Sequence, residues 1–245
     1  MGLINKEKIS MSETTIPQTL ADEMFKAGVH FGYSKTRRHP SVIKFIFATK
    51  NKVDIVNVEK VAAQLETATK LLAELAAKGK TVLFVGVKPE AREIIKEVAG
   101  SLGQPYVTER WVGGMLTNFP EIKRRIDRLA DLKEKKENGE LDKYTKKERL
   151  LLDMEIAKMH SMFYGISTMK KAPDAMFIID PKREHIALAE ANKIGIPVIA
   201  LASTDSNIKD VMFPIVANDS SLSSIRFFMD RVQKAFRDGG NALSA

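Results

Sequence analysis

The feature that most constrains the fold is a strand pattern that occurs twice, each time after an amphipathic helix. Residues 102–107 and 194–199 each combine a glycine that ends a helix with a proline that precedes an apolar run. Residues 81–85 are apolar on both faces, as a parallel strand covered by helices is, and residues 172–180 form another buried strand that ends in an acid. This alternation predicts an α/β fold with a doubly wound parallel sheet.

Amphipathic segments around these strands are the expected helices, each with apolar side chains on one face. They cover residues 17–27, 59–78, 89–102, 183–194 and 222–236. A run over 211–216 contains Pro214, which indicates an edge strand. We expect an α/β domain composed of residues 17–118 and 165–237, with tails at 1–16 and 238–245.

Two further apolar stripes predict a helical hairpin inserted into this domain at residues 119–164. They consist of Phe119, Ile122, Ile126, Leu129 and Leu132, and of Leu152, Ile156, Met159 and Phe163. The spacing is that of a coiled coil, and the pattern breaks at Asn138-Gly139. Thr145 and Glu148 have the spacing of a capping box. With about 20 residues in each helix, the hairpin would protrude roughly 30 Å.

The strongest functional signal is a basic segment near the N-terminus, in a chain with a formal net charge of +8. Between Glu23 and Asp54 the chain has seven lysine and arginine residues and no acidic residue. A solvated surface usually mixes both signs of charge, so the absence of acids favours phosphate binding over a merely soluble loop. Residues 29–40 are expected to form a loop, followed by a β-hairpin whose basic tip is 49–52.

We therefore predict RNA-binding residues in two groups. The first group, in the basic segment, consists of Lys35, Arg37, Arg38, His39, Lys44, Lys50 and Lys52. The second group, which would form a second contact with RNA, consists of Arg110, Lys123, Arg124 and Arg125. Phe31, Tyr33 and His39 are interspersed in the first group, and their rings are suited to stacking on bases or sugars.

Other functions have weaker support. Ligands bind at strand ends in such a sheet, but the turn at 86–89 has too few glycines for a Walker loop or a dinucleotide fingerprint. Lys88 is a candidate for one phosphate at a helix N-terminus, so an enzyme or sensor for a phosphorylated small molecule is one alternative. Asp180 and Glu184 are more typical of helix capping, and Asp180 with His185 lacks a third metal ligand. An adaptor that binds protein through the helical hairpin is another alternative.

The composition argues against several classes of functional site and against a membrane-spanning or secretory segment. The chain has no cysteine, which excludes disulfides, thiolate metal sites and a cysteine nucleophile. No apolar run reaches the roughly 18 residues that span a bilayer, and no apolar core of a secretory signal is found in residues 1–15. We expect no cofactor and no metal. Taken alone, Trp111 is most simply a packing residue, and Gly113-Gly114 a turn.

Five motifs together resemble the bacterial S-two family of small-subunit ribosomal proteins over residues 17–236. They are residues 27–32, 44–47, 84–88, 110–119 and 173–177. The signature positions are His30, Phe31, Gly32, Arg110, Trp111, Gly113, Gly114, Leu116, Thr117, Asn118, Pro173, Glu184 and Glu190. The run from Arg110 to Asn118 is the most specific of them.

The resemblance implies a flavodoxin-like sheet with a protruding helical hairpin. It also implies a cytoplasmic, ribosome-associated protein without enzymatic activity, monomeric within the particle and placed between head and body against ribosomal RNA. The expected protein partners are neighbouring small-subunit proteins, including the S-one protein. Three departures from the family pattern are Tyr33, Asn57 and Ala202-Ser203-Thr204, where the family usually has histidine, aspartate and a segment that begins with aspartate.

Overall fold

The computed structural model describes residues 18–241, so the expected tail at 1–16 and residues 242–245 lie outside the described part. Its centre is a parallel five-stranded sheet in the order β5-β4-β6-β7-β8. The strands are β4 (Val82–Val85), β5 (Tyr106–Val107), β6 (Ala175–Ile179), β7 (Val198–Ala202) and β8 (Phe213–Val216). This is the 2-1-3-4-5 order of flavodoxin-like folds, which confirms the predicted doubly wound sheet. β8, which contains Pro214, lies at an edge as expected.

The two faces of this sheet contribute to two separate cores. On one face, Phe84 and Phe177 pack among α1 (Gln18–Lys26), α2 (Val58–Ala77), α3 (Pro89–Ser101) and α7 (Leu222–Asn241). On the other face, Leu83 and Met176 pack against α6 (His185–Ile194) and the segments next to the helical hairpin. Because successive side chains on a strand point to opposite faces, both covered faces require the continuous apolar runs seen in the sequence.

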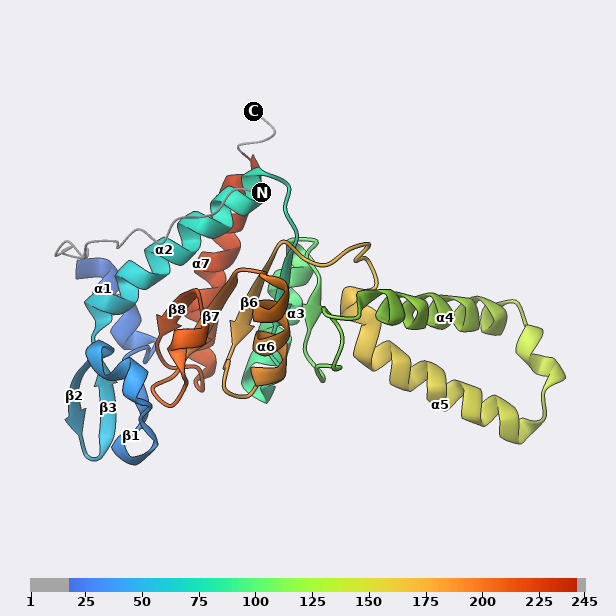
Figure 1. Cartoon of the computed structure of the whole chain (residues 1–245), viewed down its shortest axis with the longest axis horizontal. Coiled ribbons are helices and arrows are strands. Elements are labelled where there is room, and N and C mark those ends of the chain that lie inside the picture. Colours follow the sequence, from blue (N-terminus) through green and yellow to red (C-terminus); the bar gives the residue numbers. More distant parts are fainter. Residues whose placement is uncertain (1–17, 242–245) are drawn as a thin grey trace.

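A second sheet lies beside the parallel one and carries the basic segment (Figure 1). It is antiparallel in the order β1-β3-β2, formed by β1 (Phe31–Ser34), β2 (Ile46–Lys50) and β3 (Val53–Val56). The β2–β3 hairpin is as predicted, but the expectation of a loop over 29–40 was wrong. That segment contains β1 and the 3₁₀ helix Lys35–Arg37, and a second 3₁₀ helix, Pro40–Phe45, follows it. β1 forms by pairing with β3, which its own sequence does not reveal.

Two long helices, α4 (Phe119–Glu137) and α5 (Lys146–Phe163), extend together from the parallel-sheet body (Figure 1). A 3₁₀ helix, Glu140–Lys143, lies between them, and another, η4 (Tyr164–Ile166), follows α5. Arg128 bonds Glu155 at 3.0 Å and so joins the two long helices. α5 begins with the predicted capping box of Thr145 and Glu148.

The last helix is longer than the sequence indicated. Gly239-Gly240 was expected to begin a tail, but α7 continues to Asn241. Gly239 is buried, and a Cβ on it would lie 2.2 Å from the carbonyl oxygen of Ala73 on α2. The glycine therefore permits close contact between the two helices, which outweighs its low helix propensity.

Candidate nucleic-acid interface

The tip of the β2–β3 hairpin carries exposed cations of the basic segment. Asn51 and Lys52 have φ angles of 50° and 65°, as both central residues of a type I′ turn do. The turn places Lys50 and Lys52 at its outer end, where both are exposed. The backbone N–H of Lys35 donates to the carbonyl oxygen of Lys52 at 2.9 Å, so a third lysine lies beside the tip.

An open hollow of about 440 Å³ lies next to this tip. It is lined by Ser34, Lys35, Thr36, Thr49 and Lys52. Ammonium and hydroxyl groups are both donors to phosphate oxygens. Among residues 18–241, Lys35 and Lys52 have no ion-pair partner, so their charges are available to a polyanion.

The two arginines of the segment are already paired with acids from other parts of the chain. Arg38 Nε donates to Asp54 Oδ2 at 2.7 Å, and its Nη2 donates to both Asp54 and Thr49. Arg37 donates to Asp205 at 3.1 Å. Asp54 is completely buried, and its hydrogen bond from Arg38 holds the pKa of the carboxyl below its ordinary value despite burial. The segment lacks acids in sequence, but the fold brings two of them to it.

Two other predicted residues of the segment have local contacts. The Nδ1 atom of His39 lies 2.8 Å from Ser41 Oγ at the start of the second 3₁₀ helix. The ammonium group of Lys44 is exposed and lies 5.0 Å from the ring centre of Phe45. Lys44 therefore adds a positive charge to this surface. The His39 side chain instead caps the N-terminus of the Pro40–Phe45 helix.

The aromatic residues of the segment differ in how available their rings are. The guanidinium of Arg37 covers the Tyr33 ring at 4.1 Å, and the Tyr33 hydroxyl is 2.8 Å from Ser220 Oγ. Phe31 is 48% exposed, and its ring lies against His30 at an interplanar angle of 39°, with 4.1 Å between ring centres. Burial of His30 lowers the pKa of its imidazole, which favours the neutral ring. Of these rings, Phe31 offers the more open face for a base.

The loop between β5 and α4 is folded around the carboxylate of Glu190, which lies on α6. Glu190 accepts hydrogen bonds from the Trp111 indole at 3.1 Å, from the N–H groups of Gly114, Leu116 and Thr117 at 2.8, 3.0 and 3.1 Å, and from the Thr117 hydroxyl at 3.2 Å. Burial acts to raise the pKa of Glu190, but the backbone hydrogen bonds outweigh it and hold the pKa below the ordinary value. The sequence singled out these residues as a motif but gave no sign of the bonds that join them.

Other signature residues have steric or hydrogen-bonding roles, and the Glu184 side chain does not cap α6 as expected. A Cβ on Gly32 would lie 2.5 Å from Thr204 Cγ2, and the Tyr33 N–H donates to Thr204 Oγ1 at 2.8 Å. The atypical segment 202–204 therefore lies directly against β1. Glu184 is buried and accepts from the Val87 N–H at 3.3 Å, and burial raises the pKa of its carboxyl. Pro173 and Leu116 are buried, whereas Gly113 and Asn118 are exposed.

The second group of predicted cations lies away from the first. Arg110 is exposed in the loop before α4. On α4, Lys123 pairs with Asp127 at 2.7 Å, and Arg124 and Arg125 both pair with Glu121 at 3.4 and 3.6 Å. Such exposed pairs within one helix are weak and do not prevent contact with phosphates. α4 begins on the opposite side of the parallel sheet from the β2–β3 hairpin, so the two groups form separate surfaces (Figure 1).

The sheet end around Lys88 does not fit a phosphate ligand. Lys88 is buried, and its ammonium group lies 3.0 Å from Asp219, 3.3 Å from Asp180 and 2.9 Å from Ser220. An anion would have to displace two carboxylates. Burial and the charge of Asp180 raise the pKa of Asp219 to about 6. Within residues 18–241 no group of three or more potential ligands among His, Cys, Asp and Glu is suited to a metal ion.

The model of the family described as ribosomal protein S2 matches residues 24–239 of this chain. The chain belongs to the ribosomal protein S2 family. It is 41% identical to small ribosomal subunit protein uS2 of Dictyoglomus thermophilum over 220 residues, which cover 90% of this chain and 89% of that protein. It is 41% identical to uS2 of Bdellovibrio bacteriovorus, with coverages of 91% and 71%. The identity to uS2 of Pseudoalteromonas translucida is 42%, with coverages of 89% and 90%.

Family membership confirms the resemblance seen in the motifs. As a member of this family, the protein is a structural constituent of the small ribosomal subunit and not an enzyme. Among the described residues, no helix has the length and apolar character needed to cross a membrane.

Proposed function

We propose that the protein binds small-subunit ribosomal RNA through the tip of the β2–β3 hairpin, with the hollow beside it receiving backbone phosphates. The observation that carries this proposal is the set of donors around the hollow, in which Lys35 and Lys52 join the hydroxyl groups of Ser34 and Thr36. The Thr49 hydroxyl donates to Asp54 at 2.8 Å. Lys44 and Lys50 extend the positive surface. Contacts of this kind position a protein on RNA without reading its sequence.

A second RNA contact is proposed at Arg110 and the first turns of α4, where Lys123, Arg124 and Arg125 are located. The parallel sheet separates it from the first surface. Two basic surfaces on opposite sides of the parallel sheet fit a protein that lies between two parts of the particle, the head and the body. The hairpin at 119–164 would then be an inserted arm of the domain formed by 17–118 and 165–237.

Three further proposals rest on family membership alone. They are the support of S-one docking by this protein, its presence as a single copy in the particle and its cytoplasmic location. The hairpin surface and the exposed rings of Phe25, Phe31 and Phe47 are available for such protein contacts.

Charge reversal at the hairpin tip tests the main proposal. We expect Lys50→Glu/Lys52→Glu to enter small subunits at least about tenfold less than the wild type in a competitive reconstitution followed by sedimentation. The slope of log K against log salt for RNA binding should fall by about 0.9 for each phosphate of duplex RNA that the variant no longer binds. The matched control is Lys193→Glu/Lys234→Glu, which reverses two exposed lysines on α6 and α7, outside both surfaces. Equal incorporation of the two double variants would overturn the proposal.

A further inference from the structure

Three charged side chains meet where the basic segment lies against the ends of β6 and β7. Arg37 Nη2 and Lys182 Nζ donate to the same atom, Oδ2 of Asp205, at 3.1 and 2.8 Å. Lys182 follows β6 and Asp205 follows β7, and these two strands are parallel neighbours, so their carboxyl ends lie at one edge of the sheet. This is the edge at which ligands bind in doubly wound folds.

The charges of this cluster do not cancel. The Asp205 side chain is 4% exposed, whereas those of Arg37 and Lys182 are 53% and 52% exposed. Within residues 18–241, Asp205 is the only ion-pair partner of either cation, so one positive charge is left uncompensated at the surface. Around Lys88 the balance is the reverse, because one buried ammonium group faces two carboxylates. An anion is therefore attracted to the Asp205 cluster and not to Lys88.

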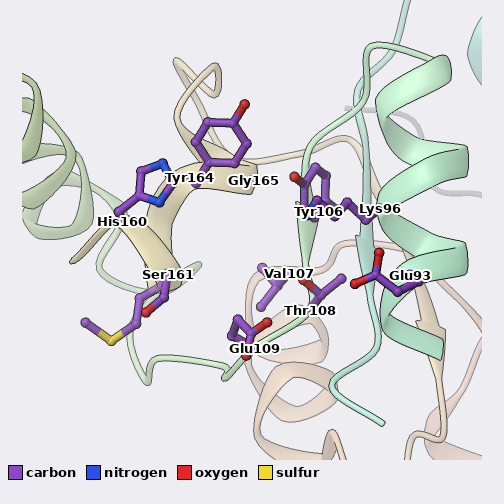
Figure 2. A pocket seen from close by; sticks show the side chains of 11 residues that line it. Glu93, Lys96, Tyr106, Val107, Thr108, Glu109, His160, Ser161, Tyr164 and Gly165 are labelled. Atoms are coloured by element: carbon purple, nitrogen blue, oxygen red, sulfur yellow. The ribbon is translucent and has the colours of Figure 1, made fainter. Parts of the chain in front are cut away.

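The hollow at the base of the α4–α5 hairpin has no such excess of positive charge. It has a volume of about 160 Å³ and lies where α3, β5 and the end of α5 meet (Figure 2). Its lining includes two glutamates, Glu93 and Glu109, and one lysine, Lys96. It therefore does not suit a phosphate, and the Asp205 cluster is the better candidate for one.

The two cations are held close together. Both nitrogen atoms lie within 3.1 Å of one carboxylate oxygen, so they are near enough to contact a single phosphate group. The Arg37 guanidinium also lies over the Tyr33 ring at 4.1 Å, and the Tyr33 hydroxyl is 2.8 Å from Ser220 Oγ. Each cation has N–H donors beyond the one that it gives to Asp205. Because both side chains are already oriented, binding an anion costs little side-chain entropy.

We propose that Arg37 and Lys182 bind one backbone phosphate of small-subunit RNA between them. Arg37 directly follows Lys35 and Thr36, which line the hollow at the hairpin tip. The site thus extends the first phosphate surface from the antiparallel sheet to the edge of the parallel sheet. Lys182 lies far from the basic segment in sequence, and only the fold brings it there. This inference rests on the proposed function, since it requires that the protein binds that RNA.

Phosphate-ethylation interference tests the inference. Small subunits are reconstituted without this protein from sparsely ethylated RNA and then captured with the tagged wild type or a variant. Ethylation removes the negative charge of a phosphate, so RNA ethylated at a contacted phosphate is depleted from the captured particles. Lys182→Gln and Arg37→Gln should each abolish the depletion at one and the same phosphate. Lys182→Gln should also weaken capture about tenfold, as expected for the loss of a hydrogen bond to a charged group.

The matched control is Lys80→Gln, which breaks another exposed lysine–aspartate pair. Lys80 bonds Asp174 at 3.0 Å, and the two residues precede β4 and β6, at the opposite edge of the parallel sheet. This variant should retain the wild-type depletion pattern. The comparison of Lys182→Gln with Lys80→Gln decides the matter even if Arg37→Gln disturbs the fold of the basic segment.

The outcomes separate this inference from the proposed function. If Lys182→Gln and Lys80→Gln give the same depletion pattern, the Arg37–Lys182 site is overturned while RNA binding at the hairpin tip stands. The same holds if Lys182→Gln and Arg37→Gln lose the depletion at different phosphates, since the two cations would then not share one. If capture by the wild-type protein depletes no ethylated phosphate, the proposed function itself fails.

Discussion

At the scale of single residues, Glu190 and Trp111 are joined across 79 positions of the chain by the indole hydrogen bond. Glu190→Gln would put an amide N–H₂ among donors that need an acceptor. We expect it to lower the free energy of unfolding by about 3 kcal/mol, because several hydrogen bonds to a buried charged group disappear together. Denaturant titration followed by fluorescence of Trp111, the only tryptophan, measures this change. Glu155→Gln, which removes an exposed ion pair, should cost less than about 0.5 kcal/mol. Similar costs for the two variants would contradict the role of Glu190.

The lowered pKa of Glu190 also predicts how the loop responds to acid. Since the folded pKa lies below the unfolded value, the ionised carboxylate stabilises the fold fully above the unfolded pKa of about 4.3. This stabilisation is lost as the pH falls through the folded pKa. The emission of Trp111 should therefore hold constant from pH 7 to 5 and shift to the red below about pH 4. A shift between pH 5 and 7 would show that another group controls the loop.

The pair of Arg38 and Asp54 predicts a folding defect where the sequence predicted only a binding defect. Arg38→Ala leaves the completely buried carboxylate of Asp54 without its cation, and we expect it to cost about 3 kcal/mol of stability. Adding Asp54→Asn removes the unpaired charge and should recover part of that loss. Thermal denaturation compares Arg38→Ala and Arg38→Ala/Asp54→Asn with Lys50→Ala, which should leave the stability unchanged. If Arg38→Ala is as stable as Lys50→Ala, the pair has no structural role.

At the scale of elements, Gly165 sets how closely η4 lies against β5. Gly165→Ala would place a methyl group against the Tyr106 carbonyl, which requires the hairpin base to move. We expect a cost of about 2 kcal/mol, as for overpacked sites, and a melting temperature lower by about 4 to 8 °C. Gly113→Ala is the control, since its Cβ would meet nothing within 4 Å. An unchanged melting temperature for Gly165→Ala would mean that the junction is loosely packed.

Helices and strands with a regular spacing of apolar residues could be predicted from the sequence. Those that form through contacts with residues far away in the chain could not. The strands of the parallel sheet and helices α2 to α6 follow apolar patterns with recognisable ends. β1 was missed because it forms by pairing with β3, and the end of α7 was missed because Gly239 packs on Ala73. The exposed lysines of the basic segment were predictable from the acid-free run, and their contact with RNA stays a prediction. The pairing of Arg37 with Asp205, 168 positions away, was not.

At the scale of the whole molecule, the two basic surfaces lie on opposite sides of the parallel sheet. Changes at sites that share no partners usually add in free energy. We therefore expect the incorporation defect of Lys50→Glu/Lys52→Glu to multiply with that of Arg124→Glu/Arg125→Glu when the four changes are combined. Competitive reconstitution of the three variants measures this. A combined defect no larger than that of one pair would mean that the two surfaces do not act separately on the particle.

The ion pairs of Arg37 and Arg38 also bear on how the protein joins the particle. They tie the basic segment to Asp205, next to the parallel sheet, and to Asp54 of β3 through contacts within the protein itself. Association then requires little ordering of backbone, and less of the interaction free energy is offset by lost chain entropy. Under the proposed function, the segment meets RNA as a preformed surface, and we expect the rate of association to depend on diffusion and ionic strength and not on a coupled folding step.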